Sequence, residues 1–316
     1  MTPTPTYLVT GAGGGVGGVS GLVAEQLIGR GDAVRAMVHR EDSRAEALRE
    51  LGAQVVVGDL TNPVDVASAT FGITRMFFNM SVSPRYLEAT AEVCAAATDG
   101  DGLELLVNMS QMTVSQMTAT STAESRQQRL HWLAEHVIDW SGIPVAHIRP
   151  TVFLDNPLFT VMAAQSIREH DQLALPFGTG RTSPVAVTDV ADAVTSVLTA
   201  PDDHAHAVYE LTGPEVLNLD ELAAQYAAAL DRPIQAVRVP YAKWLDHLTE
   251  IGLDPHVQQH IATMAQLHGD DRYNRLTTDV AQLTGHPAQS VEEYVRLHRS
   301  RFGTVKTASV GPPLGQ

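Results

Sequence analysis

Residues 7–18 read YLVTGAGGGVGG, a short apolar run followed directly by a glycine-rich turn. The glycines at positions 11, 14 and 17 permit a tight turn and leave no Cβ between the backbone and a bound group. Free amides at the start of a following helix would face an anion. The stretch predicts a strand, a phosphate-binding turn and a helix, with a dinucleotide as ligand. The residues that we expect at the diphosphate are Gly11, Gly14, Gly15, Val16 and Gly17.

Short apolar runs alternate with segments of helical periodicity through the first half of the chain. The expected strands are residues 7–10, 33–38, 54–57, 75–78, 103–108 and 145–148, with a further one at 207–211. This alternation predicts an α/β fold, a doubly wound parallel Rossmann sheet. Residues 184–194, PVAVTDVADAV, predict a strand that runs into a helix with Asp189 as its N-cap.

The texture of the sequence changes after Pro150, where Pro and Gly scatter and helical segments then dominate. We expect residues 1–155 to form the dinucleotide-binding core, with 182–213 returning to it. Residues 156–181 and 214–302 are expected to form a smaller, mainly helical substrate lobe. Residues 303–316 offer little to bury, which predicts a flexible tail.

The chain has 316 residues, and 21 Lys and Arg stand against 36 Asp and Glu, a net charge of −15. A surface this negative repels phosphodiester backbones and anionic lipid head groups, so neither nucleic acid nor membrane is expected as a partner. Cys94 is the single cysteine, which excludes an internal disulfide and suits a reducing cytoplasm. No signal-peptide pattern or membrane-spanning run is present. We expect a cytoplasmic protein with a small-molecule substrate, and a homodimer stays open.

The end of the second expected strand reads Met37-Val38-His39-Arg40 and lacks the acid that would bind the ribose 2′-hydroxyl of NAD. Arg40 and Arg44 instead indicate a guanidinium clamp on a 2′-phosphate, which favours NADP(H) over NAD(H). The alternative is that both arginines are solvated charges at a helix start.

Polar residues also follow the next three expected strands. Asp59, before Leu60, could accept a hydrogen bond from the adenine amino group or cap the helix that begins near Asn62. The adenosine side is then assigned to Asn79, Met80 and Ser81, and the carboxyl end of the fifth strand contributes Ser110 and Gln111 to cofactor binding.

The chain resembles the NmrA-like group of atypical short-chain dehydrogenases/reductases over nearly its whole length. The segments that carry the resemblance are VTGAGGGVGG (9–18), VHR (38–40), VVGDL (56–60), VNMS (107–110), HWLAEHVIDWSG (131–142), VAHIRPTVFLDN (145–156) and PVAVTDVADAV (184–194). The resemblance implies a Rossmann core and NADP(H) binding. It also implies either reduction of small hydrophobic acceptors such as quinones, or cofactor sensing without turnover.

Ordinary short-chain reductases carry a Tyr and a Lys four residues apart on the helix after the fifth strand, with a Ser at that strand's end. Ser110 matches the Ser, but counting back from Glu135 places His131 at the Lys position and Gln127 at the Tyr position. Gln127 cannot supply a proton at neutral pH. His131 could hold the nicotinamide ribose, deliver a proton, or be an ordinary helix histidine. We assign Ser110 and His131 as the catalytic residues.

A conjugated acceptor suits a site that lacks the usual tyrosine proton donor. Hydride addition to a quinone gives a stabilised phenolate, for which a hydrogen-bond donor suffices. The residues expected to line the substrate pocket are Met112, Phe153, Asn156 and Phe177, although core packing would also explain them. Residues 112–125 are expected to form a mobile loop over the nicotinamide or an ordinary surface loop.

We therefore predict an NADP(H)-dependent oxidoreductase acting on a small uncharged conjugated carbonyl or quinone. The alternatives are a non-catalytic NADP(H)-sensing regulator, and an isomerase or tailoring enzyme of aromatic metabolites that uses the same cofactor. No metal site is expected, because the pairs His256/His260 and His204/His206 lack a third ligand at a suitable spacing.

Overall fold

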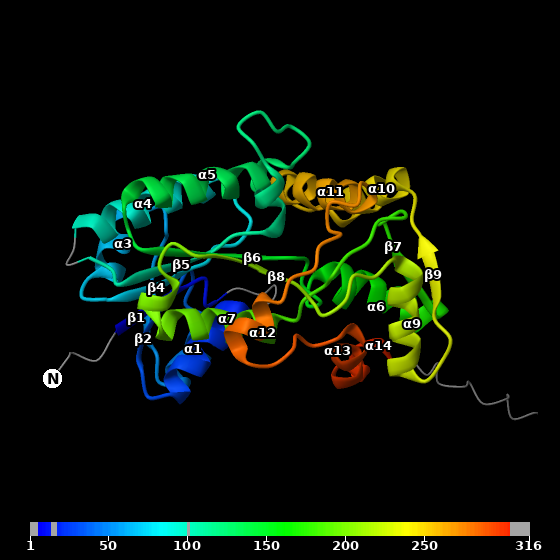
Figure 1. Ribbon diagram of the computed structural model, residues 1–316, viewed down its shortest axis with the longest axis horizontal. Coiled ribbons are helices and arrows are strands. Elements are labelled where there is room, and N and C mark those ends of the chain that lie inside the picture. The colour runs from blue at the N-terminus through cyan, green and yellow to red at the C-terminus, as the bar shows by residue number, and fades with distance from the viewer. Residues whose placement is uncertain (1–5, 14–17, 100–101, 304–316) are drawn as a thin grey trace, which may run out of the picture.

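A seven-stranded parallel sheet forms the centre of the computed structural model, which describes residues 6–13, 18–99 and 102–303 (Figure 1). The strand order is β3-β2-β1-β4-β5-β6-β8. The order reverses between β1 and β4, and ligands of such sheets bind at that switch point. The strands are β1 (Thr6–Thr10), β2 (Ala33–Val38), β3 (Gln54–Val57), β4 (Arg75–Phe78), β5 (Leu105–Met109), β6 (Val145–Pro150) and β8 (Val208–Leu211).

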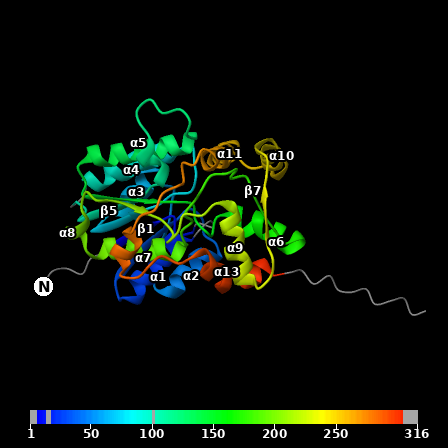
Figure 2. The ribbon, with the colours of Figure 1, turned by 45° about the vertical axis from the view of Figure 1, so that its right-hand side comes forward.

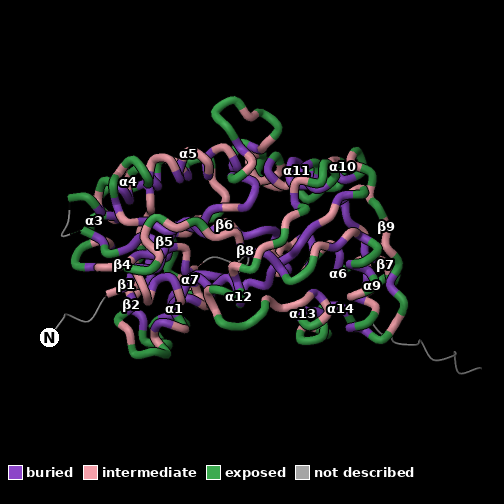
Figure 3. Tube along the Cα trace, viewed as in Figure 1, coloured by how far each residue is buried: buried purple, intermediate pink, exposed green. Residues whose placement is uncertain are grey.

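Helices cover both faces of this sheet, which confirms the predicted doubly wound α/β fold (Figure 1). One face carries α1 (Val19–Gly29), α2 (Ser43–Leu51), α7 (Val187–Thr199) and α12 (Asp279–Thr284); the other carries α3 (Pro63–Thr70), α4 (Tyr86–Asp99) and α5 (Arg126–Ser141). Each helix buries an apolar stripe, as Val19, Val23 and Leu27 do in α1. Figure 3 shows the buried strands between these helical layers.

A second hydrophobic cluster lies beyond the carboxyl end of the sheet (Figure 2). Its elements are η2 (Leu158–Ala163), α6 (Ala164–His170), β7 (Gln172–Leu175), α9 (Leu219–Leu230), β9 (Gln235–Arg238), α10 (Tyr241–Ile251), α11 (Pro255–Gly269), α13 (Val291–Leu297) and α14 (Arg299–Phe302); α8 (Pro201–His204) precedes β8. Helices dominate it, but β7 and β9 pair as a small parallel sheet that the sequence analysis missed. The proposed domain boundaries stay a prediction.

Residues 184–194 contain the predicted helix, but neither the predicted strand nor the predicted N-cap. Val185 makes only one isolated bridge, to Phe153, and α7 begins at Val187 with Ala186 as its N-cap. Asp189 therefore lies inside the first turn, where its carboxylate accepts a hydrogen bond from the Gln289 N–H at 2.8 Å. The assignment of Asp189 as N-cap was wrong, because its carboxylate accepts from the distant Gln289 N–H and not from an amide at the start of α7.

None of the helices in the described ranges has the length and apolar character that crossing a membrane requires. The tail predicted at 303–316 lies, apart from Gly303, outside the described residues.

Candidate functional site

The glycine turn begins where β1 meets β4. Gly11 has φ +69°, and a Cβ at this position would lie 2.7 Å from the Asn79 carbonyl oxygen. The Thr10 hydroxyl also fixes the backbone of Asn79 beside Gly11, because the Asn79 N–H donates to Thr10 Oγ1 at 2.9 Å. This close approach needs a glycine and fits the cradle of a dinucleotide. Gly14, Gly15, Val16 and Gly17 lie outside the described residues, so their contact with a diphosphate stays a prediction.

A cavity of about 460 Å³ opens at the carboxyl ends of β2, β3 and β4, and we call it the outer cavity. It brings together most residues that were assigned to the adenosine side. Its lining is Gly11, Gly13, Met37, Val38, His39, Arg40, Arg44, Gly58, Asp59, Leu60, Thr61, Met80, Ser81, Ser83 and Arg85.

The arginines of the outer cavity differ in their partners. Arg44 Nε lies 3.1 Å from Asp42 Oδ2, and Asp42 also caps α2 by accepting from the Arg44 N–H at 2.9 Å. These hydrogen bonds from Arg44 lower the pKa of Asp42 to about 2. Arg85 pairs with Glu88 at 2.7 Å. Arg40 makes no ion pair with any described residue. One guanidinium is thus available to an anion without breaking a pair.

The two alternatives for Asp59 are now separated. Its carboxylate accepts from the Thr61 N–H at 2.8 Å and from the Thr61 hydroxyl at 2.7 Å. Asn62 is the N-cap of α3 and accepts from the Val64 N–H at 3.0 Å. Asp59 therefore does not cap the helix, and its bond to an adenine amino group stays a prediction.

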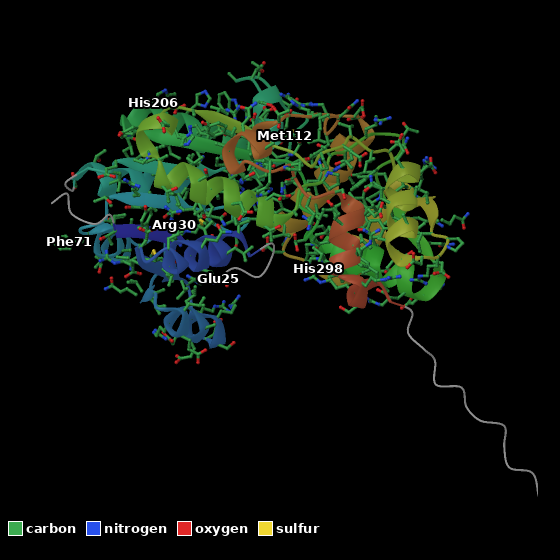
Figure 4. The ribbon with its side chains drawn as sticks, turned by 60° about the horizontal axis from the view of Figure 1, so that its bottom comes forward. Glu25, Arg30, Phe71, Met112, His206 and His298 are labelled. Carbon is green, nitrogen blue, oxygen red and sulfur yellow. The ribbon has the colours of Figure 1, made fainter. Side chains whose placement is uncertain are left out.

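A second cavity, of about 170 Å³, lies at the carboxyl ends of β5 and β6 against α5 and α11; we call it the inner cavity. Met112, which lines it, lies near the middle of the long axis, where the sheet gives way to the lobe (Figure 4). The full lining is Asn79, Met80, Met109, Ser110, Gln111, Met112, His131, Pro150, Thr151, Val152, Phe153, Asn156, His260, Met264 and Tyr273.

The inner cavity contains both predicted catalytic residues and three of the four predicted substrate residues. Sequence reasoning missed His260, Met264 and Tyr273, which come from the lobe. No motif marks them: His260 and Met264 lie on α11, which packs on α5, and Tyr273 lies four residues beyond the end of α11. The segment expected to be a loop begins with a short 3-10 turn, η1 (Met112–Gln116), whose first three residues are buried.

Phe177 does not line the inner cavity. Its ring stacks on His268 with centroids 3.9 Å apart, and His268 stacks on Tyr273 at 3.8 Å. Phe177 is 1% exposed and supports Tyr273 from behind this three-ring stack. Its assignment to the substrate pocket is corrected accordingly.

Four polar atoms of the inner-cavity residues lack a hydrogen-bond partner among the described residues. They are Ser110 Oγ, Gln111 Nε2, His131 Nδ1 and Thr151 Oγ1. A buried polar group without a partner costs about 1–3 kcal/mol, and native proteins contain few of them. Their concentration at one cavity indicates a polar ligand that would complete their hydrogen bonds.

His131, on α5, lies among aromatic and amide side chains from α4, α5 and α11. Its ring packs on Tyr86 with centroids 4.2 Å apart, and Gln127 Nε2 lies 3.2 Å from His131 Nε2. Burial, with a smaller contribution from His260, lowers the pKa of His131 to about 3. The imidazole is therefore neutral at neutral pH and is not charged as a proton donor would be.

His256 and His260, one of the two pairs considered as metal ligands, bind other side chains. His260 Nδ1 lies 2.8 Å from the hydroxyl of Ser125, the N-cap of α5, and His256 Nε2 lies 2.8 Å from Gln127 Oε1. Burial lowers the pKa of His260 to about 4. Within the described ranges no group of three or more His, Cys, Asp or Glu side chains could hold a metal ion.

The family model described as NAD(P)H-binding matches residues 14–201. The chain belongs to this family. An NAD(P)H azoreductase of Xenophilus azovorans is 27% identical over 293 residues, which cover 92% of this chain and 98% of that protein.

Solved structures agree on the fold of this family member. An Escherichia coli NADPH-dependent quinone oxidoreductase, QOR2, solved with NADPH, superposes with a TM-score of 0.80 at 21% identity, over 93% of this chain and 99% of QOR2. NmrA, a negative transcriptional regulator solved with NADP, superposes with a TM-score of 0.75 at 16% identity, over 93% of this chain and 95% of NmrA. These superpositions confirm the Rossmann fold that the NmrA-like resemblance implies.

Proposed function

We propose that this NAD(P)H-dependent oxidoreductase reduces a small, uncharged, quinone-like acceptor in the inner cavity and prefers NADP(H). The observation that carries the proposal is a set of polar atoms without partners among the described residues, in a cavity whose described lining includes no Asp, Glu, Lys or Arg. A charged substrate would find no counter-ion in this lining, whereas a carbonyl oxygen would find hydrogen-bond donors.

The side chains of the inner cavity suit a planar conjugated ring. Phe153, Met112 and Met264 offer apolar and polarizable surface, and Tyr273 is held by the ring stack behind it. Ser110 is 4% exposed and directly follows β5, at the edge where ligands of open α/β sheets bind. Its hydroxyl would donate to the acceptor oxygen.

A reduced dinucleotide, when bound, supplies the hydride. The chain's own residues would hold it along the carboxyl edge of the sheet, since both cavities border Met80 and the turn at Gly11 opens into the outer one. Around the reacting atoms the residues orient the acceptor and donate hydrogen bonds to it. A quinone needs no more, because the anion formed on hydride addition is delocalised.

The preference for NADP(H) rests on Arg40 and Arg44, which line the outer cavity beside His39 at the end of β2. Guanidinium groups recognise phosphate through paired, charge-assisted hydrogen bonds. A regulator that senses the dinucleotide without turnover is the second candidate. It is favoured by Gln127, which stands where a reductase of the ordinary short-chain type would have its phenol acid.

The test is consumption of NADPH with a panel of quinones and azo compounds. We expect saturable turnover, and Ser110→Ala should lower kcat/KM about 10-fold because one donor to the developing anion is lost. Ser196→Ala is the matched control, since its hydroxyl donates to the Leu283 carbonyl on the far face of the sheet. Tight NADPH binding without reduction of any acceptor would reject the reductase and leave the sensor.

A further inference from the structure

Gln127 has an amide whose orientation is set by its neighbours. Its Oε1 lies 3.1 Å from the Ser83 backbone nitrogen, which can only donate, and 2.8 Å from His256 Nε2. The atom facing Ser83 must therefore be the carbonyl oxygen, since Asn and Gln amides are assigned from such partners. The NH₂ group is left to face His131.

This orientation decides the tautomer of His131. Gln127 Nε2 can only donate, so the His131 Nε2 atom 3.2 Å away must accept and carries no hydrogen. The opposite tautomer would direct two N–H groups at each other. In a neutral imidazole the remaining hydrogen then sits on Nδ1, the atom without a partner among the described residues.

We propose that Gln127 is a positioning residue that fixes His131 as the Nδ1–H tautomer, so that His131 donates a hydrogen bond to the reduced acceptor and not a proton. This inference rests on the proposed function. The acceptor takes a hydride with its electron pair from the reduced dinucleotide, which becomes oxidised, and the resulting anion takes its proton from water. His131 keeps its hydrogen throughout and stabilises the anion together with Ser110.

The other polar groups around His131 already have hydrogen-bond partners, so His131 is the one that would donate to the reduced acceptor. On α4, the Tyr86 hydroxyl is already committed, since it donates to the Met109 carbonyl at 3.0 Å. On α5, one turn further along, Glu135 accepts from Arg149 Nε at 2.9 Å. On α11, His256 donates to Gln127, and His260 shares a hydrogen bond with Ser125. Burial also keeps the pKa of His131 low, at about 3, so the ring has no second proton to give.

The first test is ¹⁵N NMR of histidine-labelled protein without dinucleotide, with the His131 signals assigned from their loss in His131→Asn. We expect a protonated Nδ1 and an unprotonated Nε2 at every pH from about 5 to about 8. A protonated Nε2, or a ring that titrates near its ordinary pKa, would overturn the proposal. Because this spectrum requires no turnover, it can succeed where the proposed reductase activity fails, and the reverse.

The second test is Gln127→Glu, which keeps an oxygen for Ser83 and His256 but turns the other atom into an acceptor. A carboxylate draws a proton to His131 Nε2, so above the raised pKa the ring holds its only hydrogen there and Nδ1 is bare. We expect kcat/KM for a quinone to fall about 10-fold or more as pH rises through that pKa, with an unchanged KM for NADPH.

The matched control is His147→Gln. His147 is 3% exposed and bonds to Asn108 and Asp139, outside the inner cavity. This variant loses a buried imidazole but should keep the flat pH profile and the Nδ1–H signal of His131. A Gln127→Glu protein with a flat profile and an unchanged His131 tautomer would refute the positioning role.

Discussion

The outer and inner cavities lie on one sheet edge but hold their polar groups in opposite states. In the outer cavity the polar groups are ionised and mostly paired, as Arg44 is with Asp42 and Arg85 with Glu88. In the inner cavity the groups that lack a partner among the described residues, such as Ser110 Oγ and His131 Nδ1, are neutral and buried. The same edge therefore offers a charge-selective region and a dipole-selective region.

This difference has an energetic consequence. Exposed guanidinium groups are hydrated and screened by salt, so their existing pairs are weak and can be exchanged for a phosphate. Buried donors without a partner have already lost water, and a ligand that accepts from them removes an unfavourable state. The outer cavity should thus control which dinucleotide binds, and the inner cavity which acceptor is reduced.

The largest expected effect concerns acid. His131, His260 and His268 are buried, and burial lowers the pKa values of these side chains to about 3, 4 and 3. The unfolded chain binds these protons near pH 6.5, but the folded chain does not. The three histidines therefore do not lower the free energy of unfolding above that pH, and they lower it increasingly as pH falls below it. The free energy of unfolding should drop by about 4 kcal/mol per pH unit near pH 5.

Urea unfolding at several pH values measures this slope. His268→Gln should reduce the slope by about 1.4 kcal/mol per pH unit, because one of the three uncharged imidazoles is gone. His170→Gln, which changes an exposed residue at the end of α6, should leave it unchanged. Equal slopes in all three proteins would mean that His268 binds a proton as readily in the folded chain as in the unfolded chain.

The next effect tests the outer cavity. Replacing both Arg40 and Arg44 by Ala should weaken NADPH binding about 10- to 100-fold, because charge-assisted bonds to phosphate are worth about 1.5–3 kcal/mol. NADH, which has no 2′-phosphate, should bind as before. Calorimetry with both dinucleotides measures the two changes separately. A parallel loss for NADH would show that the arginines hold the common part of the molecule.

How far the sequence predicts each cavity follows from how local the cavity is. The glycine turn at Gly11 and the polar residues His39 and Asp59 come directly after strands, and carboxyl ends of parallel strands meet at one edge by geometry alone. The strand-to-helix pattern therefore predicts both the sheet and most of the outer cavity's lining.

The sequence also predicts the part of the inner cavity that the strand ends and α5 supply, but the part from the lobe depends on packing that no local pattern records. His260, Met264 and Tyr273 lie more than a hundred residues beyond Ser110. The first two reach the cavity because α11 packs on the start of α5, and Tyr273 lies four residues beyond the end of α11. The orientation of Gln127 likewise needs Ser83 and His256 on two other elements. The paired strands β7 and β9 were missed for the same reason, since each has only four residues and gains stability from a distant partner.

The smallest effect sharpens the role of paired charge in the outer cavity. Asp42→Ser keeps an N-cap side chain on α2 but releases the Arg44 guanidinium. An exposed ion pair contributes little free energy, so NADPH should bind only up to about 5-fold more tightly, and NADH binding should be unchanged. Glu46→Gln is the control, because Glu46 lies on the same helix and faces Arg49 at 3.4 Å. If both variants tighten NADPH binding equally, the gain comes from the lower negative charge around the cavity and the Asp42–Arg44 pair does not govern dinucleotide choice.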